Sequence, residues 1–133
     1  MRNWIMSANP RIYDHQRAFA EQGYVDWKQT RNFEIGDVVY IYLTKPMATI
    51  RYRTTVEAVN IEPYVDPYWN IQIDEIQLGK KFMRLSLAAT CDSASLAFDE
   101  LKKQGLNYVP QSPGKIRDGL REYIESCFAE ETI

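Results

Sequence analysis

The fold of this chain is decided by residues 36–61, which read GDVVYIYLTKPMATIRYRTTVEAVNI. Gly36-Asp37 is typical of a turn, and the β-branched and aromatic run after it has the length of a strand until Lys45-Pro46 ends it. The second half alternates, which predicts a strand with one face formed by Ile50, Tyr52, Thr54, Val56 and Ala58. We expect these two strands to pair as a hairpin.

The residues before the hairpin predict one strand and one helix. Residues 3–8, NWIMSA, are a short apolar segment that ends at Asn9-Pro10, because a residue that precedes proline is disfavoured in a helix. Residues 14–23, DHQRAFAEQG, have helical spacing, with Asp14 as the N-cap and Gly23 as the stop. The chain is therefore expected to open with a strand followed by a short helix.

The residues after the hairpin complete the expected architecture. They predict a strand over 70–78 with a bulge at Glu75-Ile76, a strand over 81–90, and helices over 92–105 and 116–128. A chain of 133 residues has the length of one ordinary domain. We therefore expect a single α+β domain over residues 1–133, built on a small, closed antiparallel β-barrel of five to six strands flanked by helices.

Composition limits the class of protein. The chain carries 16 Lys and Arg against 18 Asp and Glu, so its formal net charge of −2 provides no long-range basic field for nucleic acid. No apolar run approaches the ~20 residues of a membrane-spanning helix, and the two cysteines match no metal-binding spacing. These features predict a cytoplasmic protein that needs no membrane, metal or cofactor. Aromatic residues make up 13% of the chain, which indicates a binding function.

Four segments occur in one order and spacing: WIMSANPRIYD, VDWKQ, IGDVVYIYLTKP and ATIRYRTTVEAVNI. In that order they resemble the EVE domain of the PUA-like superfamily, a relative of the YTH domain. The resemblance is clearest from Trp4 to about Ile61 and weaker beyond. It implies a PUA-like barrel whose concave aromatic pocket accepts a flipped-out modified base. EVE domains are regarded as non-catalytic readers of modified DNA bases, often associated with restriction or defence systems.

Site residues follow from the resemblance. Trp27 would offer a flat surface for stacking, and Asn9 or Gln29 would offer an amide to the edge of a base. The expected base pocket comprises Asn9, Trp27, Lys28, Gln29, Tyr42 and Tyr52. Contacts to phosphates are expected from Lys45, Arg51, Arg53, Lys115 and Arg117. The expected partner is nucleic acid with a modified base, DNA rather than RNA, with modified cytosine as the first candidate and a restriction or defence protein as a second partner.

Several of these residues also suit a purely structural role. A core can bury Trp27, Asn9 before Pro10 suits a turn, and charges on the polar face of a strand are usually solvated. The loop aromatics Tyr64, Tyr68 and Trp69 can cap the barrel, form a recognition edge or contact a second copy. The alternative function is therefore a small-ligand or protein-interaction domain that uses the same pocket or this loop.

Signals for catalysis are weak. His15 is the one histidine of the chain, and nothing around it or Cys91 marks a nucleophile turn or an oxyanion hole. Asp74-Glu75 would be paired carboxylates only if a bulge turned both to one face. The sequence contains no GxxxxGK[ST], GxGxxG or HExxH motif, and it does not show the Lys and Glu-x-Arg pattern of RNA-directed ASCH domains. The chain is accordingly expected not to be an enzyme.

Overall fold

The computed structural model describes residues 2–73 and 81–131 of the chain. The elements, in chain order, are β1 (Asn3–Ala8), α1 (His15–Gln22), β2 (Tyr24–Lys28), β3 (Val38–Leu43), β4 (Thr49–Ile61), β5 (Phe82–Thr90), the 3₁₀ turn η1 (Ala94–Leu96), α3 (Phe98–Lys103), β6 (Gly114–Lys115) and α4 (Asp118–Glu131). The predicted limits of the first helix are confirmed, because the Asp14 carboxylate accepts the Arg17 N–H at its start and Gly23 adopts a left-handed backbone at its end (φ 83°).

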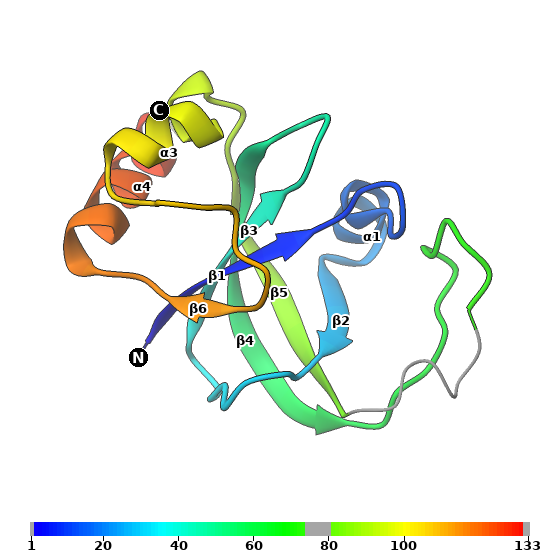
Figure 1. Cartoon of the computed structure of the whole chain (residues 1–133). Helices are drawn as coiled ribbons and strands as arrows, with labels where there is room; N and C mark the ends of the chain where they lie inside the picture. The colour runs from blue at the N-terminus through cyan, green and yellow to red at the C-terminus, as the bar shows by residue number, and fades with distance from the viewer. Residues whose placement is uncertain (1, 74–80, 132–133) are drawn as a thin grey trace.

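The strands form one sheet in the order β2-β5-β4-β3-β1-β6. β1 and β3 are parallel, since α1 and β2 carry the chain back between them, and the other pairs are antiparallel. Within the described residues β2 and β6 do not pair, so the sheet curves without closing (Figure 1). The predicted α+β class is confirmed. The sheet is mixed rather than antiparallel, and in the described part of the chain no hydrogen bonds close it into the predicted barrel.

Each face of the sheet buries its own hydrophobic cluster. α1 packs Ala18 and Phe19 against one face, and η1, α3 and α4 cover the other. Figure 1 shows α3 and α4 together on one side of the sheet and α1 on the opposite side. Because both faces are covered, all six residues of β3 are buried, as is typical of a central strand.

A bulge in β4 corrects the predicted alternation of that strand. A strict period of two places Ile50 and Tyr52 on one face. In the structure Ile41 pairs with Tyr52 while Tyr42 pairs with Ile50, so Arg51 is an extra residue. Ile50 consequently lies with Tyr42 in the cluster under α4, and Tyr52 lies in the cluster under α1.

Two other elements differ from the prediction. The helix expected over 92–105 is divided into η1 and α3, because Ala97 has an extended backbone (φ −68°, ψ 154°) and forms a β-bridge with Thr49. Residues 70–73 form no strand, and the remainder of the strand expected over 70–78, with its bulge at Glu75-Ile76, lies outside the described residues. β2, in contrast, is a strand that the sequence pattern did not predict.

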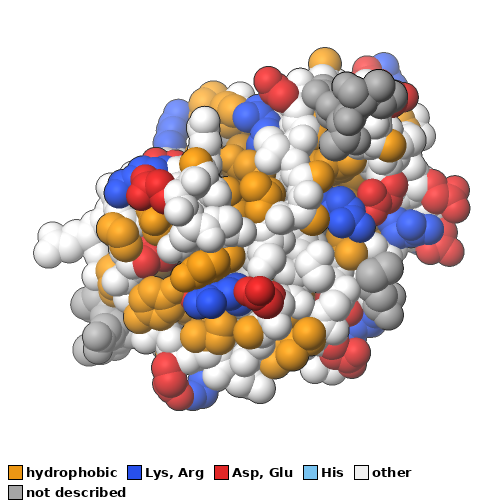
Figure 2. All heavy atoms as spheres, turned by 180° about the vertical axis from the view of Figure 1, so that it is seen from behind, with side chains coloured by type: hydrophobic (Ala, Val, Ile, Leu, Met, Phe, Trp, Pro, Cys, Tyr) orange, Lys and Arg blue, Asp and Glu red, His pale blue; other side chains and the backbone are white. Residues whose placement is uncertain are grey.

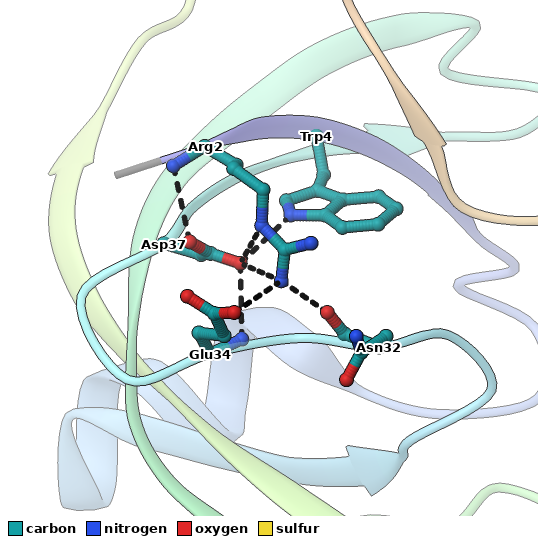
Figure 3. Close-up of polar contacts among 5 residues, drawn as sticks. All are labelled: Arg2, Trp4, Asn32, Glu34 and Asp37. Atoms are coloured by element: carbon teal, nitrogen blue, oxygen red, sulfur yellow. Dashed lines mark hydrogen bonds and ion pairs between the residues drawn. The ribbon is translucent and has the colours of Figure 1, made fainter.

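Asp37 connects the starts of β1 and β3 (Figure 3). Its buried carboxylate accepts hydrogen bonds from the backbone N–H groups of Arg2 and Glu34 and from Trp4 Nε1–H, each at 3.0 Å. The Arg2 guanidinium pairs with the same carboxylate at 3.1 Å. Burial alone would raise the pKa of Asp37, but these hydrogen bonds lower it below its ordinary value. Asp37 is therefore an ionised anchor as well as a turn residue.

Charged and apolar side chains are mixed on the surface of the protein. The face in Figure 2 intersperses acidic, basic and apolar side chains, and it presents no continuous field of one sign. Among the described residues, no helix has the length and apolar content needed to cross a bilayer.

Candidate nucleic-acid interface

Three aromatic rings from separate parts of the chain meet beside β2. Trp27 comes from β2, Tyr13 precedes α1, and Trp69 follows β4 in the loop that leads to β5. The rings of Trp27 and Trp69 are stacked, with centroids 5.1 Å apart and planes 22° apart. Tyr13 meets both edge-on, at 5.0 Å from Trp27 and 5.2 Å from Trp69. We call these three residues the aromatic cluster.

Hydrogen bonds hold the loop that carries Trp69 against the segment before α1. The Tyr13 hydroxyl donates to Asp66 Oδ2 (2.6 Å), and the Tyr68 N–H donates to Asp66 Oδ1 (2.9 Å). Two backbone bonds of 2.8 Å link the same segments, from Asp14 N–H to Tyr68 O and from Asn70 N–H to Ile12 O. Burial and the bond to Asp66 raise the pKa of Tyr13, so the hydroxyl stays protonated as the donor.

An ion pair between the buried Asp26 and the partly exposed Arg84 fixes β2 next to Trp27. Asp26 accepts from Arg84 Nε at 2.8 Å and Nη2 at 3.0 Å, and it also accepts from the Tyr64 hydroxyl. The bidentate bond raises the pKa of Arg84, and the guanidinium lies 3.9 Å from the centroid of the Tyr24 ring. Since side chains alternate across a strand, these contacts determine the direction in which Trp27 projects.

A pocket of about 220 Å³ opens where β1 and β2 approach across the open side of the sheet. Met6 and Ser7 of β1 form one wall, and Trp27 and Lys28 of β2 form the other. Thr30, Gln111, Ser112 and Pro113 complete the lining. We call it the seam pocket. β6 pairs with Trp4 and Ile5, so within the described residues no strand pairs with the end of β1 on that side.

A second hollow, of about 720 Å³, shares Gln111, Ser112 and Pro113 with the seam pocket. Its lining contains three cations, Arg31, Lys115 and Arg117, and no Asp or Glu. Arg31 is held by Ser112 Oγ (2.8 Å) and the Pro113 carbonyl (3.3 Å). The lining also includes Tyr108, which is 71% exposed. We call this hollow the basic groove, and its shared lining residues place it beside the seam pocket.

Comparison with known proteins identifies the fold. No family model matches the chain, and no curated protein matches it. Among solved structures, an ASCH protein from Zymomonas mobilis has a TM-score of 0.62 at 17% identity, with 94% of each chain covered. A hypothetical protein from Leishmania major has a TM-score of 0.67 at 17% identity, with 100% of this chain and 98% of that chain covered. The fold is PUA-like.

A third structure supports the same assignment at still lower identity. A protein from Rhodopseudomonas palustris has a TM-score of 0.69 at 9% identity and covers 98% of this chain. These structures agree with the predicted PUA-like architecture at the level of fold alone. The Zymomonas mobilis structures carry the ASCH name rather than the EVE name, so the EVE assignment stays a prediction.

The PUA-like fold distributes the six predicted pocket residues over several places. Trp27 and Lys28 lie in the seam pocket. Asn9 forms the turn before α1 by accepting the Arg11 N–H (2.9 Å), and Gln29 accepts the Asn60 N–H (3.1 Å). Tyr52 is buried against Phe19 in the cluster under α1. Tyr42 faces the opposite core, beside α3, so it does not share a pocket with Trp27.

The predicted phosphate-binding residues are divided in the same way. Lys115 and Arg117 lie together in the basic groove. Lys45 lines a separate cavity near α3. Arg51 pairs with Asp92 at 3.1 Å, and Arg53 pairs with Glu125 of α4 at 2.9 Å, so both engage protein carboxylates. The bulge at Arg51 is the physical reason that the cations of β4 do not form one row.

Sequence reasoning missed Tyr13 and Trp69 as neighbours of Trp27, and it missed Arg31 as a cation of the basic groove. Only Trp69 had a local signal, because it ends the aromatic segment PYVDPYW. Arg31 follows β2 in a loop without regular structure, and its proximity to Lys115 and Arg117 depends on contact across the open edge of the sheet.

The residues considered for catalysis do not assemble. His15 is buried in the region of the aromatic cluster, with its ring centroid 5.7 Å from that of Trp27, whereas Cys91 belongs to the core on the other face. Burial lowers the pKa of His15 to about 4. Asp74 and Glu75 lie outside the described residues. Within the described ranges, no group of three metal-ligating side chains occurs.

Proposed function

We propose that this protein is an EVE-like, non-catalytic module that binds nucleic acid by holding one modified base in the seam pocket beside Trp27. The observation that carries the proposal is the junction of two features. A pocket walled by an indole shares three lining residues with a groove whose lining carries three cations and no acidic side chain. A base and its own phosphates need these two surfaces side by side.

The energetics are adequate for an unpaired base. Stacking on an aromatic face is worth about 1–3 kcal/mol per base, and removing a base from a duplex costs a few kcal/mol. Trp69 and Tyr13 hold the Trp27 indole in place, so less conformational entropy is lost when a base binds. The free energy gained by stacking therefore roughly balances the cost of flipping the base out of a duplex. Hydrogen bonds to the base edge then decide which base is selected.

Groups for such hydrogen bonds line the same pocket. Lys28 supplies an ammonium donor, Thr30 a hydroxyl, and Gln111 an amide with both a donor and an acceptor. The volume of about 220 Å³ corresponds to roughly seven water molecules at ~30 Å³ each, which suits a single pyrimidine ring. A modified cytosine in DNA is accordingly our first candidate.

The basic groove is suited to the flanking backbone. Arg31, Lys115 and Arg117 can each neutralise one phosphate, and the exposed Tyr108 ring offers a face to a neighbouring base. With a net charge of −2 and a cation cluster of three residues, the chain is better suited to a short, locally opened strand than to long duplex DNA.

Binding of short oligonucleotides tests the proposal. The central base would be cytosine, 5-methylcytosine or 5-hydroxymethylcytosine, in DNA and in RNA, and anisotropy would report the affinity. We expect one modified base in DNA to bind best. Trp27→Ala should weaken this binding by about tenfold or more, because one stacking contact is lost. Trp27→Phe, which keeps an aromatic face, should retain most of it.

Circular dichroism and thermal unfolding of both variants show whether the fold is kept. If folded Trp27→Ala and the parent bound every oligonucleotide with equal affinity, the base would not bind in the seam pocket. Binding of free nucleosides but of no strand would instead favour the small-ligand alternative at the same pocket.

A further inference from the structure

A separate cavity lies between the start of α1 and the tip of the β3–β4 hairpin. It has a volume of about 360 Å³, within the range of roughly 300–1,000 Å³ that is usual for small-molecule sites. His15 and Tyr52 line it together with Arg51, and Leu43, Pro46 and Met47 add apolar surface. We call it the α1 cavity. None of the seam-pocket residues lines it.

Two buried polar atoms without a hydrogen-bond partner belong to residues of this cavity. They are His15 Nε2 and Arg51 Nε, and they are the two such side-chain atoms found in the described part of the chain. Leaving a buried polar group unsatisfied costs about 1–3 kcal/mol. Because both residues line the same cavity, a molecule bound there that reaches these two atoms would complete both.

The hydrogen-bonding role of His15 follows from its other ring nitrogen. Nδ1 lies 3.2 Å from the Tyr13 carbonyl oxygen, which can only accept, so Nδ1 carries the proton. Burial disfavours the charged ring and lowers its pKa to about 4, which keeps Nε2 as a bare acceptor at neutral pH. Nε2 therefore requires a donor from the ligand.

Arg51, in contrast, requires an acceptor from the ligand. Its Nη2 pairs with Asp92 at 3.1 Å, whereas Nε–H has no acceptor. Arg51 is the extra residue of the β4 bulge, so its side chain leaves the regular alternation that places Arg53 on Glu125 at the other face. The ligand must therefore offer an acceptor to Arg51 and a donor to His15.

We propose that the α1 cavity binds a small uncharged molecule with an amide-type edge, in which an N–H donor lies beside a carbonyl or ring-nitrogen acceptor. Nucleobases and primary carboxamides both have this edge. A carboxylate or phosphate would satisfy Arg51 but would place a second acceptor against His15 Nε2. This proposal is independent of base binding at Trp27, since it concerns a different cavity and a different set of residues.

The experiment uses the single histidine of the chain as a reporter. Long-range ¹H–¹⁵N spectra of the whole protein would follow the His15 ring nitrogens during titration with nicotinamide, nicotinate, cytidine, and a short oligonucleotide that contains cytidine. Nicotinamide and nicotinate share a ring and differ in amide against carboxylate. We expect nicotinamide or cytidine at millimolar concentration to shift the Nε2 resonance, and nicotinate to bind at least tenfold more weakly.

The panel also separates the sources of the amide edge. A response to nicotinamide alone assigns a carboxamide ligand, a response to cytidine alone assigns a free nucleobase, and a tighter response to the oligonucleotide assigns a base within a strand. If oligonucleotides bound nowhere on the protein, the function proposed for Trp27 would be contradicted, but binding of nicotinamide or cytidine in the α1 cavity would still stand. If neither nicotinamide nor cytidine moves the His15 signals, or if nicotinate binds equally well, the proposal is overturned.

Variants test the two hydrogen bonds separately. His15→Phe keeps a ring but removes the acceptor, and we expect about a tenfold loss of affinity by calorimetry, with partial recovery in His15→Gln. Arg51→Lys should cost a similar factor because it removes Nε–H but keeps the charge near Asp92. Arg53→Lys is the matched control, since Arg53 lies outside the cavity lining. Unchanged affinity in folded His15→Phe and Arg51→Lys would refute the site.

Discussion

Asp37 holds the first strand against the turn before β3. Its carboxylate is 1% exposed and accepts from two backbone N–H groups, the Trp4 indole and the Arg2 guanidinium. Gly36-Asp37 predicts the turn from the sequence alone. The other role of Asp37, as an anchor for Arg2 and Trp4, depends on the parallel pairing of β1 with β3.

Removal of the Asp37 carboxylate should lower the stability of the fold. Asp37→Ala leaves several buried donors without an acceptor, so we expect a loss of about 3–5 kcal/mol in the free energy of unfolding, measured with urea. Glu34→Gln is the control, because Glu34 is 70% exposed in its side chain and lies 3.9 Å from Arg2. It should change stability by less than about 0.5 kcal/mol. Comparable losses in the two variants would contradict the anchoring role.

His15 should make stability depend on pH. Its pKa is about 4 in the folded protein against an ordinary value of 6.5, so between these values the unfolded chain binds a proton that the native chain excludes. The free energy of unfolding should therefore fall as the pH is lowered from 6.5 to 4, with a contribution from His15 of at most about 1.4 kcal/mol per pH unit.

His15→Gln isolates this contribution because every carboxylate is unchanged. Urea unfolding of the parent and the variant at several pH values should show a shallower slope for the variant between pH 4 and 6.5. Parallel slopes would mean that the ring titrates normally in the folded state.

At the scale of elements, the segment from Tyr64 to Asn70 is bound to the segment before α1 and is not a free loop. It is bound to residues 12–14 by two backbone hydrogen bonds and by the Tyr13 hydroxyl on Asp66. This attachment places Trp69 on Trp27. Of the three roles considered from the sequence for Tyr64, Tyr68 and Trp69, packing is visible in the structure, where Trp69 contacts Tyr13 and Trp27; a recognition edge and a contact with a second copy stay predictions.

Tyr13→Phe tests the attachment. It removes a hydrogen bond to a carboxylate, worth about 1.5–3 kcal/mol, and leaves the ring in place. We expect a matching decrease in the free energy of unfolding and a shift of tryptophan fluorescence to longer wavelength as Trp69 becomes more exposed. Tyr68→Phe removes only a 3.5 Å contact with Glu21 and should have a much smaller effect. Identical unfolding curves for Tyr13→Phe and the parent would show that the loop is held by its backbone bonds alone.

At the scale of the whole molecule, charge is distributed so that a net negative chain still carries one local cation cluster. Arg2, Arg53 and Arg84 are paired with Asp37, Glu125 and Asp26, respectively. The basic groove retains Arg31, Lys115 and Arg117 without an acidic side chain in its lining. Three phosphate contacts correspond to a slope of about −2 in log K against log salt for a single strand.

Oligonucleotide affinity should therefore fall roughly twentyfold between 50 and 200 mM salt. Replacing both Lys115 and Arg117 with Gln should reduce the slope to about −0.7. The same loss of charge in Lys45→Gln with Lys102→Gln, outside the groove, should leave the slope near −2. If the control pair lowered the slope as much as the groove pair, the effect would come from net charge rather than from phosphate contacts.

The sequence by itself determined the elements that rest on local chemistry. The N-cap at Asp14, the left-handed stop at Gly23, the turn at Gly36-Asp37 and the β-branched hairpin strands are all encoded by neighbouring residues, and each is present. Trp27 and Lys28 both line the seam pocket, and Lys115 and Arg117 both line the basic groove, while their roles in binding stay predictions.

Only the tertiary structure decided which residues meet. The bulge at Arg51 exchanges the faces of Ile50 and Tyr52, and the alternation of β3 turns Tyr42 away from Trp27. β2 has little pattern of its own and becomes a strand through pairing with β5. The seam pocket, the stack of Trp69 on Trp27 and the α1 cavity all join segments distant in the chain. Their geometry depends on long-range packing, which a local sequence pattern does not contain.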